Sequence, residues 1–278
     1  MTAPGEPVDR ETGGPQRQTT ERLVAITRGP SPRMALGERT YADDSPIDGT
    51  LAAKQHEEYQ NALRRCGARV VSIPGCSELA DCVFVEDTAI VVDEIAVMMS
   101  MGALSRRDEV PTIEAALRDF RTIARVELPA RIDGGDVVCS GRDVFVGLSK
   151  RTNAAGVDAL RTILAPFGYR VTAVPVLHCL HLKSACSALP DGSLLVNAGL
   201  ISTSPIQGRE FVPVPPAEQL AGDVLVIGER IIASDAFPET ISLLAARGWE
   251  VVPVSVSEFA KAEGGVTCMS LVFNTGLD

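Results

Sequence analysis

The phrase GARVVSIP at residues 67–74 decides the fold, because close variants of it recur along the chain. Each variant is a short β-type run that is closed by Pro or Ser, and the variants are IARVELP at 123–129, GYRVTAVP at 168–175 and GWEVVPVS at 248–255. Three of the four phrases begin with a glycine that ends a helical pattern: Gly67, Gly168 and Gly248. The repeated order is therefore a helix, a glycine C-cap and a strand.

Pairs of β-runs joined by turn sequences lie between these phrases, at residues 82–99, 136–147, 187–197 and 223–233. Their turn dipeptides are typical of hairpins, and three of them are Ser140-Gly141, Asp191-Gly192 and Gly228-Glu229. A last single run, GVTCMSLVFN, occupies residues 265–274. A unit of strand, hairpin and helix thus recurs about every 40 to 50 residues.

About five such units either stack in a line or close into a ring. A ring lets the first and last strands share one unit, so that RLVAITRG at 22–29 pairs with MSLVFN at 269–274. We predict one α/β domain over residues 21–278, made of five pseudo-repeats around a central axis that carries the active site. The alternative is a doubly wound parallel sheet, which needs single strands alternating with helices and fewer hairpins.

The composition restricts the class of protein. The 278 residues are 45% apolar but only 4% aromatic, so Val, Ile, Leu and Ala must build the core. The net charge is −10 and no basic patch stands out, which argues against nucleic-acid binding. Residues 1–20 are rich in Pro, Gly, Thr and Gln, and we expect a disordered tail there. No apolar run approaches the length that a membrane span needs.

The cysteines predict a reducing compartment. There are seven, an odd number, and none of them forms a CxxC pair, so a structural zinc site is not expected. The sequence also shows no signal peptide. We therefore expect free thiols and a cytoplasmic location.

Two groups of carboxylates stand in otherwise apolar β-type segments. LADCVFVEDTAIV at 79–91 and RIDGGDVVCSG at 131–141 supply them: Asp81, Glu86, Asp87, Asp133 and Asp136. Burying such groups is costly unless they are paired or bind a cation. Either group alone is compatible with ordinary turn chemistry, but both lie at corresponding places in the repeat. Equivalent places in a closed ring face one central site.

The chain has three histidines. His56 lies in a charged helical pattern, and we expect an exposed side chain. His178 and His181 lie in VLHCLHLKSACS at 176–187, where a histidine serves either as a general acid and base or as a structural residue.

Cys268 follows Gly264 and Gly265 and precedes an apolar run, so it is either a small buried hydrophobe or a nucleophile presented by a turn. With His181 and the carboxylates, it suggests covalent catalysis by a thiolate on a cationic substrate. A guanidinium fits, because its planar fork of donors matches carboxylates.

Five motifs in order resemble those of the dimethylarginine dimethylaminohydrolases, members of the guanidino-group-modifying superfamily. They are DCVFVED at 81–87, DGGDV at 133–137, FVGLSKRTN at 145–153, HLKS at 181–184 and GGVTCMS at 264–270. The resemblance runs from about residue 22 onward. It implies a pentein-type fold, a five-bladed pseudo-symmetric α/β propeller, in agreement with the repeat.

The resemblance also implies the role of each site residue. Cys268 would attack the guanidinium carbon, His181 would protonate the departing amine and then activate water, and Asp133 would orient His181. Substrate binding would fall to acids and arginines: Glu86 and Asp87 at the guanidinium, Asp81 at the α-amino group, and Arg106 and Arg151 at the α-carboxylate. The products would be citrulline and an alkylamine, formed through an S-alkylthiouronium intermediate.

The resemblance implies no cofactor and no metal, although a Cys/His pocket could take up Zn²⁺ as an inhibitor. The partner is a small arginine derivative, and a homodimer is compatible with the sequence. The family closes its pocket with a loop near the N-terminus, and the usual loop leucine falls at about Arg39 here. An arginine deiminase or arginine dihydrolase of the same superfamily is the nearest alternative, and a non-catalytic arginine-binding protein on the same fold is the alternative of a different class.

Overall fold

The structure is a computed structural model that describes residues 23–43 and 45–276. The predicted tail, residues 1–20, lies outside the described residues. Among the residues described, no helix combines the length and the apolar character that crossing a membrane requires.

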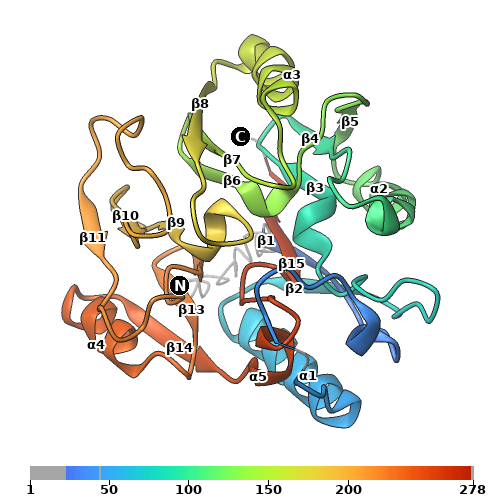
Figure 1. The fold of residues 1–278 in the computed structure, drawn as a ribbon, viewed down its shortest axis with the longest axis vertical. Coiled ribbons are helices and arrows are strands. Elements are labelled where there is room, and N and C mark those ends of the chain that lie inside the picture. The colour runs from blue at the N-terminus through green and yellow to red at the C-terminus, as the bar shows by residue number, and fades with distance from the viewer. Residues whose placement is uncertain (1–22, 44, 277–278) are drawn as a thin grey trace, which may run out of the picture.

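Fifteen strands form five separate three-stranded sheets, which are arranged around a common centre in Figure 1. The strands are β1 (Leu23–Arg28), β2 (Arg69–Ile73), β3 (Ala89–Val91), β4 (Ile95–Met98), β5 (Thr122–Arg125), β6 (Val137–Ser140), β7 (Asp143–Leu148), β8 (Arg170–Pro175), β9 (Cys186–Ala188), β10 (Leu194–Val196), β11 (Phe211–Pro213), β12 (Val224–Ile227), β13 (Arg230–Ser234), β14 (Glu250–Val254) and β15 (Ser270–Asn274). The sheet orders are β15-β1-β2, β3-β4-β5, β6-β7-β8, β9-β10-β11 and β12-β13-β14. Five small sheets confirm the predicted propeller and exclude a single doubly wound sheet.

Every blade has one antiparallel and one parallel strand pair, as β6-β7 and β7-β8 illustrate. A parallel pair needs a crossover connection, and in four blades a helix supplies it. These helices are α1 (Gly49–Arg65), α2 (Val110–Leu117), α3 (Ala154–Leu164) and α4 (Pro238–Ala246), which lie on the outside of the ring in Figure 1, and a short α5 (Ser257–Ala260) precedes β15. In the fourth blade, residues 197–210 join β10 to β11 without a helix. The repeat phrase follows a helix in the other blades, and the fourth blade, which lacks that helix, also lacks the phrase.

The first and last strands close the ring as predicted. β1 pairs antiparallel with β15 from Leu23↔Asn274 to Thr27↔Ser270, and parallel with β2 on its other edge. Gly67, Gly168 and Gly248 have φ values of 94°, 77° and 97°, a backbone region that favours glycine. These values fit the predicted helix ends.

Apolar contacts between the helices and the sheets hold each blade together. Val157, Leu160 and Leu164 of α3 belong to the same buried cluster as Val144 and Val146 of β7. Full burial of a leucine stabilises a fold by about 1.5–3 kcal/mol relative to exposure. A blade with a helix is therefore held on its outer side, which leaves its loop at the centre free to carry polar groups.

The prediction for His56 was wrong. Its side chain is 5% exposed, and it lies near Phe259 with the two ring centroids 6.4 Å apart. α1 buries one face at helical spacing, which includes Ala52, His56, Tyr59 and Leu63. The charged residues around His56 in the sequence belong to the opposite face. Burial lowers the pKa of His56 to about 4, so the imidazole is neutral at physiological pH.

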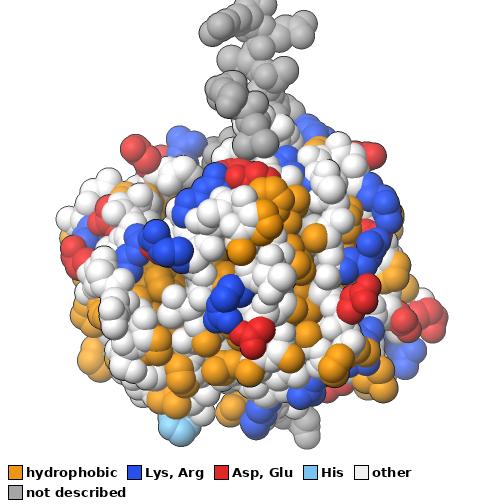
Figure 2. All heavy atoms as spheres, turned by 90° about the horizontal axis from the view of Figure 1, so that it is seen from above, with side chains coloured by type: hydrophobic (Ala, Val, Ile, Leu, Met, Phe, Trp, Pro, Cys, Tyr) orange, Lys and Arg blue, Asp and Glu red, His pale blue; other side chains and the backbone are white. Residues whose placement is uncertain are grey.

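The face of the molecule in Figure 2 carries side chains of both charges. On the face in Figure 2, Lys and Arg side chains are scattered among Asp and Glu and do not gather into one patch.

Candidate active site

One small cavity at the centre of the ring collects most of the predicted site residues. Six of the eight line it: Asp81, Asp87, Arg106, Arg151, His181 and Cys268. The remaining two, Glu86 and Asp133, bond to residues beside it. The cavity has a volume of about 20 Å³. That is room for about one water molecule, so a whole arginine derivative enters only if the walls move.

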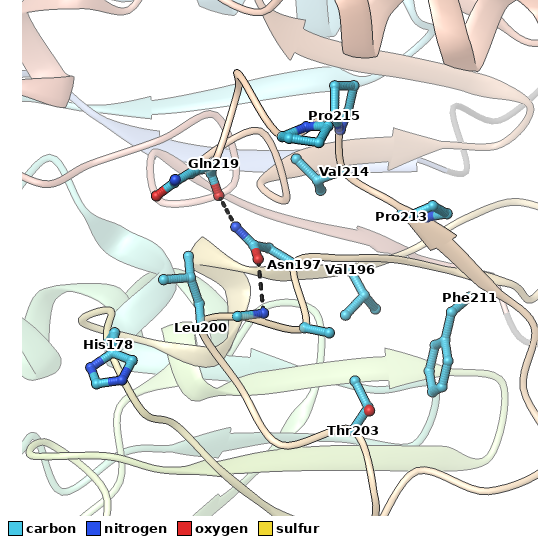
Figure 3. Close-up of a pocket in the computed structure, with 13 residues that line it drawn as sticks. His178, Val196, Asn197, Leu200, Thr203, Phe211, Pro213, Val214, Pro215 and Gln219 are labelled. Atoms are coloured by element: carbon cyan, nitrogen blue, oxygen red, sulfur yellow. Dashed lines mark hydrogen bonds between the residues drawn. The ribbon is translucent and has the colours of Figure 1, made fainter.

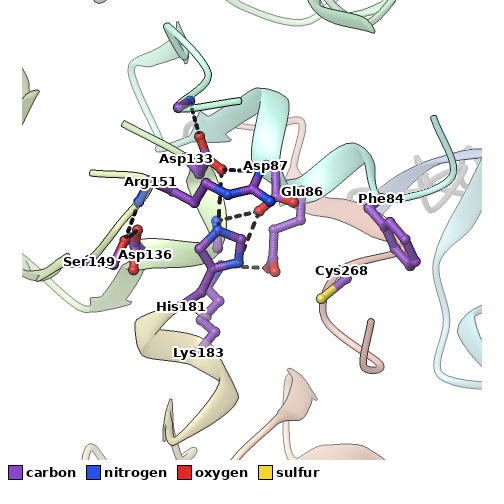
Figure 4. Close-up of polar contacts among 12 residues, drawn as sticks. Phe84, Glu86, Asp87, Asp133, Asp136, Ser149, Arg151, His181, Lys183 and Cys268 are labelled. Carbon is purple, nitrogen blue, oxygen red and sulfur yellow. Dashed lines mark hydrogen bonds and ion pairs between the residues drawn. The ribbon is translucent and has the colours of Figure 1, made fainter. Parts of the chain in front are cut away.

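The side chains come from the inner turns of different blades. Glu86 and Asp87 lie in the short 3-10 helix η2 (Val85–Thr88), which leads into β3, and Asp136 ends η4 (Gly134–Asp136), which leads into β6. His181 caps η6 (Leu182–Ser184) before β9, and Cys268 lies two residues before β15. Repetition of one local geometry thus brings together residues that are far apart in the sequence (Figure 4).

The turn before Cys268 is built by close approach. A Cβ atom on Gly264 would lie 2.1 Å from the Phe84 ring, and one on Gly265 would lie 1.6 Å from a carboxylate oxygen of Asp223. The residue with a positive φ is Glu263, at 61°, which is uncommon for a residue other than glycine. The Gly265 amide donates to Sγ of Cys268 at 3.3 Å, and the Cys268 carbonyl accepts from the Glu86 amide at 3.1 Å. The two glycines are therefore needed for space, and Cys268 is held at its sulfur and at its backbone carbonyl.

The surroundings of Cys268 disfavour a thiolate in the free protein. Burial raises the pKa of the thiol well above its usual value, and the carboxylates of Asp223, Glu86 and Asp87 add to that effect. The Gly265 amide opposes it. The resting sulfur is therefore a neutral thiol at physiological pH, and an arriving cation would favour its ionisation.

His181 has the opposite setting, because its neighbours favour the charged form. Its Nε2 lies 3.2 Å from Oδ2 of Asp133, and its Nδ1 lies 3.7 Å from Oδ1 of Asp87. Burial lowers the pKa of His181, but the carboxylates of Asp87, Asp136 and Asp133 outweigh it and raise the pKa to about 9. The imidazole is protonated at physiological pH and can act as an acid.

Two further groups fix the position of His181. Asp133 is fully buried, and its Oδ1 accepts from the Gly102 amide at 2.6 Å. Asp136 accepts from the Leu182 amide at 3.0 Å, beside His181 in the chain. A Cβ on Gly135 would lie 2.7 Å from Nδ1 of His181, so the imidazole packs directly on that glycine. The double glycine of DGGDV therefore gives the ring its space.

Burial raises the pKa of Asp136 to about 6, although hydroxyl groups of Ser149 and Thr152 each donate to it at 2.6 Å. Sequence reasoning singled out Asp136 and gave it no role. Its place before a strand, in the same motif as Asp133, was the available signal.

Arg106 is buried in a network of ion pairs. Its Nη1 lies 2.5 Å from Oδ2 of Asp87, and its Nη2 lies 2.8 Å from Oε2 of Glu109. Nη2 also donates to the Phe84 carbonyl at 3.0 Å. Burial raises the pKa of Asp87, but His181 and Arg106 outweigh it and lower that pKa to about 2. A substrate carboxylate would have to compete with these contacts, so the predicted contact of Arg106 with it stays a prediction.

Arg151 differs from Arg106 because part of its guanidinium has no hydrogen-bond partner among the described residues. Nη1 of Arg151 is buried without a hydrogen bond to any described residue, and it lies 3.9 Å from Oδ2 of Asp133. An unpaired buried N–H of a cation is costly unless an anion completes it. Arg151 thus fits the predicted contact with a carboxylate.

Glu86 does not line the cavity but lies behind it, where it pairs with Lys183 and Thr267. Its Oε1 lies 2.5 Å from Nζ of Lys183, and its Oε2 accepts from the Thr267 hydroxyl at 2.7 Å. Burial raises the pKa of Glu86, and Lys183 opposes that effect. In Figure 4, the Glu86 side chain lies between those of His181 and Cys268.

A loop near the N-terminus covers the cavity. The Glu38 amide donates to Asp81 at 3.0 Å, and burial raises the pKa of Asp81. Oε1 of Glu263 accepts from three successive amides of this loop, those of Thr40 at 2.9 Å, Tyr41 and Ala42 at 2.6 Å.

The side chain of Arg39 turns back on its own loop, where Nη1 donates to the Asp43 carbonyl at 2.9 Å. Glu38, not Arg39, lines the cavity. Sequence reasoning gave no role to Glu38 or Glu263, and no pattern in the chain marks either of them.

Asp87, Asp133 and His181 offer ligand atoms that lie within 4.8 Å of one another. Nε2 of His181 and one oxygen of each acid already take part in the contacts described above. The predicted absence of a metal stays a prediction.

A larger cavity of about 670 Å³ lies in the fourth blade (Figure 3). Among its 13 lining residues, His178 is the one with an ionisable side chain, and the others are apolar or uncharged, such as Phe211, Val214 and Asn197. It offers neither a carboxylate for a cation nor a nucleophile. The histidine that sequence reasoning left open beside His181 therefore lies outside the central site.

Comparison with known families gives one clear match. Residues 38–202 match the family model described as N,N dimethylarginine dimethylhydrolase, eukaryotic. The chain is 41% identical over 248 residues to the N(G),N(G)-dimethylarginine dimethylaminohydrolase of Streptomyces coelicolor, which covers 89% of this chain and 95% of that protein. It is 32% identical over 228 residues to the enzyme of that name from Pseudomonas aeruginosa, which covers 81% of this chain and 90% of that protein.

Solved structures agree. A mutant of the Pseudomonas aeruginosa enzyme in complex with citrulline superposes with a TM-score of 0.87 at 30% identity, over 91% of this chain and 99% of that one. The N-terminal domain of a cyanobacterial arginine dihydrolase superposes with a TM-score of 0.82 at 17% identity, over 90% and 97% of the two chains. The second likeness concerns the fold alone.

Proposed function

Because this chain belongs to the dimethylarginine dimethylaminohydrolase family, we propose that it hydrolyses Nω-methylated arginines to citrulline and an alkylamine. The observation that carries the proposal is the meeting of Cys268 and His181 at one cavity, with carboxylates on its walls. The reaction breaks a C–N bond of a linear amidine. It needs a nucleophile, an acid for the leaving amine and an anionic site for the cationic group.

Cys268 is the nucleophile. Its thiol stays neutral until the substrate arrives, because burial and the nearby carboxylates raise its pKa. The guanidinium brings a positive charge next to the sulfur and favours loss of the thiol proton to solvent, because His181 is already protonated. The thiolate then attacks the central carbon of the guanidinium.

His181 supplies and later removes a proton. With a pKa raised to about 9, it carries the proton that the departing alkylamine takes when the C–N bond breaks. This leaves an S-alkylthiouronium on Cys268 and a neutral imidazole. The imidazole accepts a proton from the attacking water, the C–S bond breaks, and citrulline leaves.

Charged groups along the walls orient the substrate. Asp87 is the lining carboxylate nearest to His181, so it favours a guanidinium at the reacting end. Arg151 has an unpaired Nη1 for the α-carboxylate, and Asp81 offers a carboxylate to the α-amino group. Glu86 supports the guanidinium end through Thr267 and Lys183.

The test is citrulline formation from asymmetric dimethylarginine and from arginine, with Cys268→Ser measured alongside. Citrulline from dimethylarginine that disappears in the variant supports the proposal. No citrulline from either substrate would refute an enzyme of this class. A far higher kcat/KM with arginine would favour a deiminase, and release of ornithine and ammonia would favour a dihydrolase.

The same assay separates the enzyme from a non-catalytic arginine-binding protein. Binding of dimethylarginine without product, unchanged in Cys268→Ser, is the outcome that a binder predicts. A binder needs neither a nucleophile nor a histidine held by carboxylates, and this chain has both.

We also propose a cytoplasmic location, which the seven free cysteines support. Cell fractionation with an antibody against the protein tests it. The homodimer stays a prediction, and light scattering of the purified protein would measure the oligomeric state.

A further inference from the structure

Asp223 is a buried acid that the reaction outlined above does not use. It precedes β12 in the fifth blade and is 9% exposed. It forms no ion pair with any residue that the structure describes. Its nearest contacts lie in the turn that carries Cys268, which belongs to the first blade. It therefore joins two blades at the nucleophile.

The carboxylate of Asp223 braces that turn at two points. Oδ1 accepts from the Thr267 amide at 3.1 Å, and Thr267 directly precedes Cys268. Oδ2 lies against Gly265, where a Cβ atom would come within 1.6 Å of it. Gly265 in turn donates its amide hydrogen to Sγ of Cys268. One oxygen thus binds Thr267, and the other packs against Gly265 at the opposite end of the segment 265–267.

The charges around the sulfur give Asp223 a second effect. The groups that face Cys268 are Glu86, Asp87, Asp223, Lys183, His181 and Tyr59. Glu86 is paired with Lys183 and Asp87 with Arg106, so the charge of each of these carboxylates is largely offset. Asp223 forms no ion pair within the part of the chain that the structure describes, although Lys183 lies near enough to oppose the rise of its pKa. Burial and the neighbouring Glu86 raise the pKa of Asp223 to about 7, so it is ionised above that pH.

We propose that Asp223 is a positioning residue for Cys268, which fixes the nucleophile turn and keeps the thiol protonated until a cation binds. The proposal rests on the proposed function only in so far as Cys268 is the nucleophile. It makes the free enzyme poorly reactive toward general electrophiles. A bound guanidinium would offset the charge of Asp223 and release the thiolate where it is needed.

The experiment measures how fast iodoacetamide alkylates Cys268 between pH 6.5 and 10, with peptide mass spectrometry to separate it from the six other thiols. Asp223→Asn keeps an oxygen for the Thr267 amide and removes the charge. The expected result at pH 8 is an increase of about tenfold in the alkylation rate and a midpoint at lower pH.

Glu218→Gln is the matched control. Glu218 is also a buried acid, which accepts from the Thr240 amide and hydroxyl at 2.8 and 2.6 Å and does not line the cavity. Its removal should leave the pH profile of Cys268 unchanged. The readout needs no turnover, so a protein that makes no citrulline still gives a valid result.

An unchanged midpoint in a folded Asp223→Asn protein would overturn the proposal. If that variant does not fold, Asp223→Ser removes the same charge with a smaller side chain and is measured in the same way. Failure of both to fold would overturn the proposal as well, because Asp223 would then be required for stability. In the full assay, the acid limb of kcat/KM should move to lower pH in Asp223→Asn, which loss of a purely structural contact would not produce.

Discussion

The histidine half of the site and the cysteine half use the same chemical groups with opposite consequences for charge. Carboxylates around His181 stabilise the imidazolium, because the charges are of opposite sign. Carboxylates around Cys268 disfavour the thiolate, because the charges are of the same sign. Both groups therefore hold their protons in the free enzyme. In the proposed reaction, His181 therefore starts as an acid, and the cationic substrate, not the histidine, would activate the sulfur.

The largest effect should come from replacing Cys268. Cys268→Ser should lower kcat by at least about 10³-fold, because the alcohol is a far weaker nucleophile. The melting temperature should change little, since the sulfur faces a cavity and is only partly buried. Citrulline assays and thermal melts measure the two quantities. A large fall in melting temperature would identify Cys268 as a core residue instead.

Breaking the histidine half should have the next largest effect. Asp133→Asn removes a carboxylate 3.2 Å from Nε2 of His181, so the pKa of His181 should fall and less acid should be present at pH 8. We expect kcat to fall by about 100-fold, and the basic limb of the pH profile to move to lower pH. A uniform loss at every pH would argue that Asp133 serves orientation alone.

Protein stability should depend on the charge of His181. Its pKa is about 9 in the fold against 6.5 in an unfolded chain, so the folded state binds the proton more tightly. The stabilisation is fully present below pH 6.5 and is lost as the pH rises through 9, on the order of 2 to 3 kcal/mol. Denaturant melts at pH 6.5 and 9 measure it. His181→Gln should remove most of this pH dependence, and an equal loss in both proteins would place its source elsewhere.

The next effects concern the two arginines that line the cavity, Arg151 and Arg106. Arg151→Ala should raise KM by about tenfold through loss of the carboxylate contact, with Arg151→Lys as the control that keeps the charge. Steady-state kinetics measure it, and an unchanged KM would refute the contact.

Arg106→Ala should instead lower the melting temperature, because Asp87 and Glu109 would be left buried without their cation.

The smallest effect should come from the covering loop. Glu263→Gln weakens the acceptor for the amides of Thr40, Tyr41 and Ala42, so the loop should open more readily. We expect a change of about threefold in KM with kcat nearly constant. Hydrogen exchange of residues 37–43 should increase in the variant. Unchanged exchange would show that other contacts hold the loop.

The repeat in the sequence was enough to predict the ring, because each blade carries its own strand and glycine pattern. The repeat could not predict the missing helix of the fourth blade, because no repeat phrase falls on the connection between β10 and β11. His56 was mispredicted because charged neighbours in the sequence hid the buried face of α1.

The partners of buried polar groups were the main feature that could not be predicted from the sequence. Arg106 and Arg151 look alike as single residues, and only their three-dimensional neighbours separate the cation with several close partners from the one whose Nη1 lacks a hydrogen bond to any described residue. Asp223 and Glu263 act through backbone amides, which leave no trace in residue identity.

The pairing of β1 with β15 has a mechanical consequence. Its register sets the start of β1 beside the end of β15, at Leu23↔Asn274. A pulling force across these two strand ends would open their hydrogen bonds one pair after another, as a zipper opens. Cys268 lies two residues before the other end of this seam. An opening that starts at Leu23↔Asn274 would therefore reach the turn that carries Cys268 last.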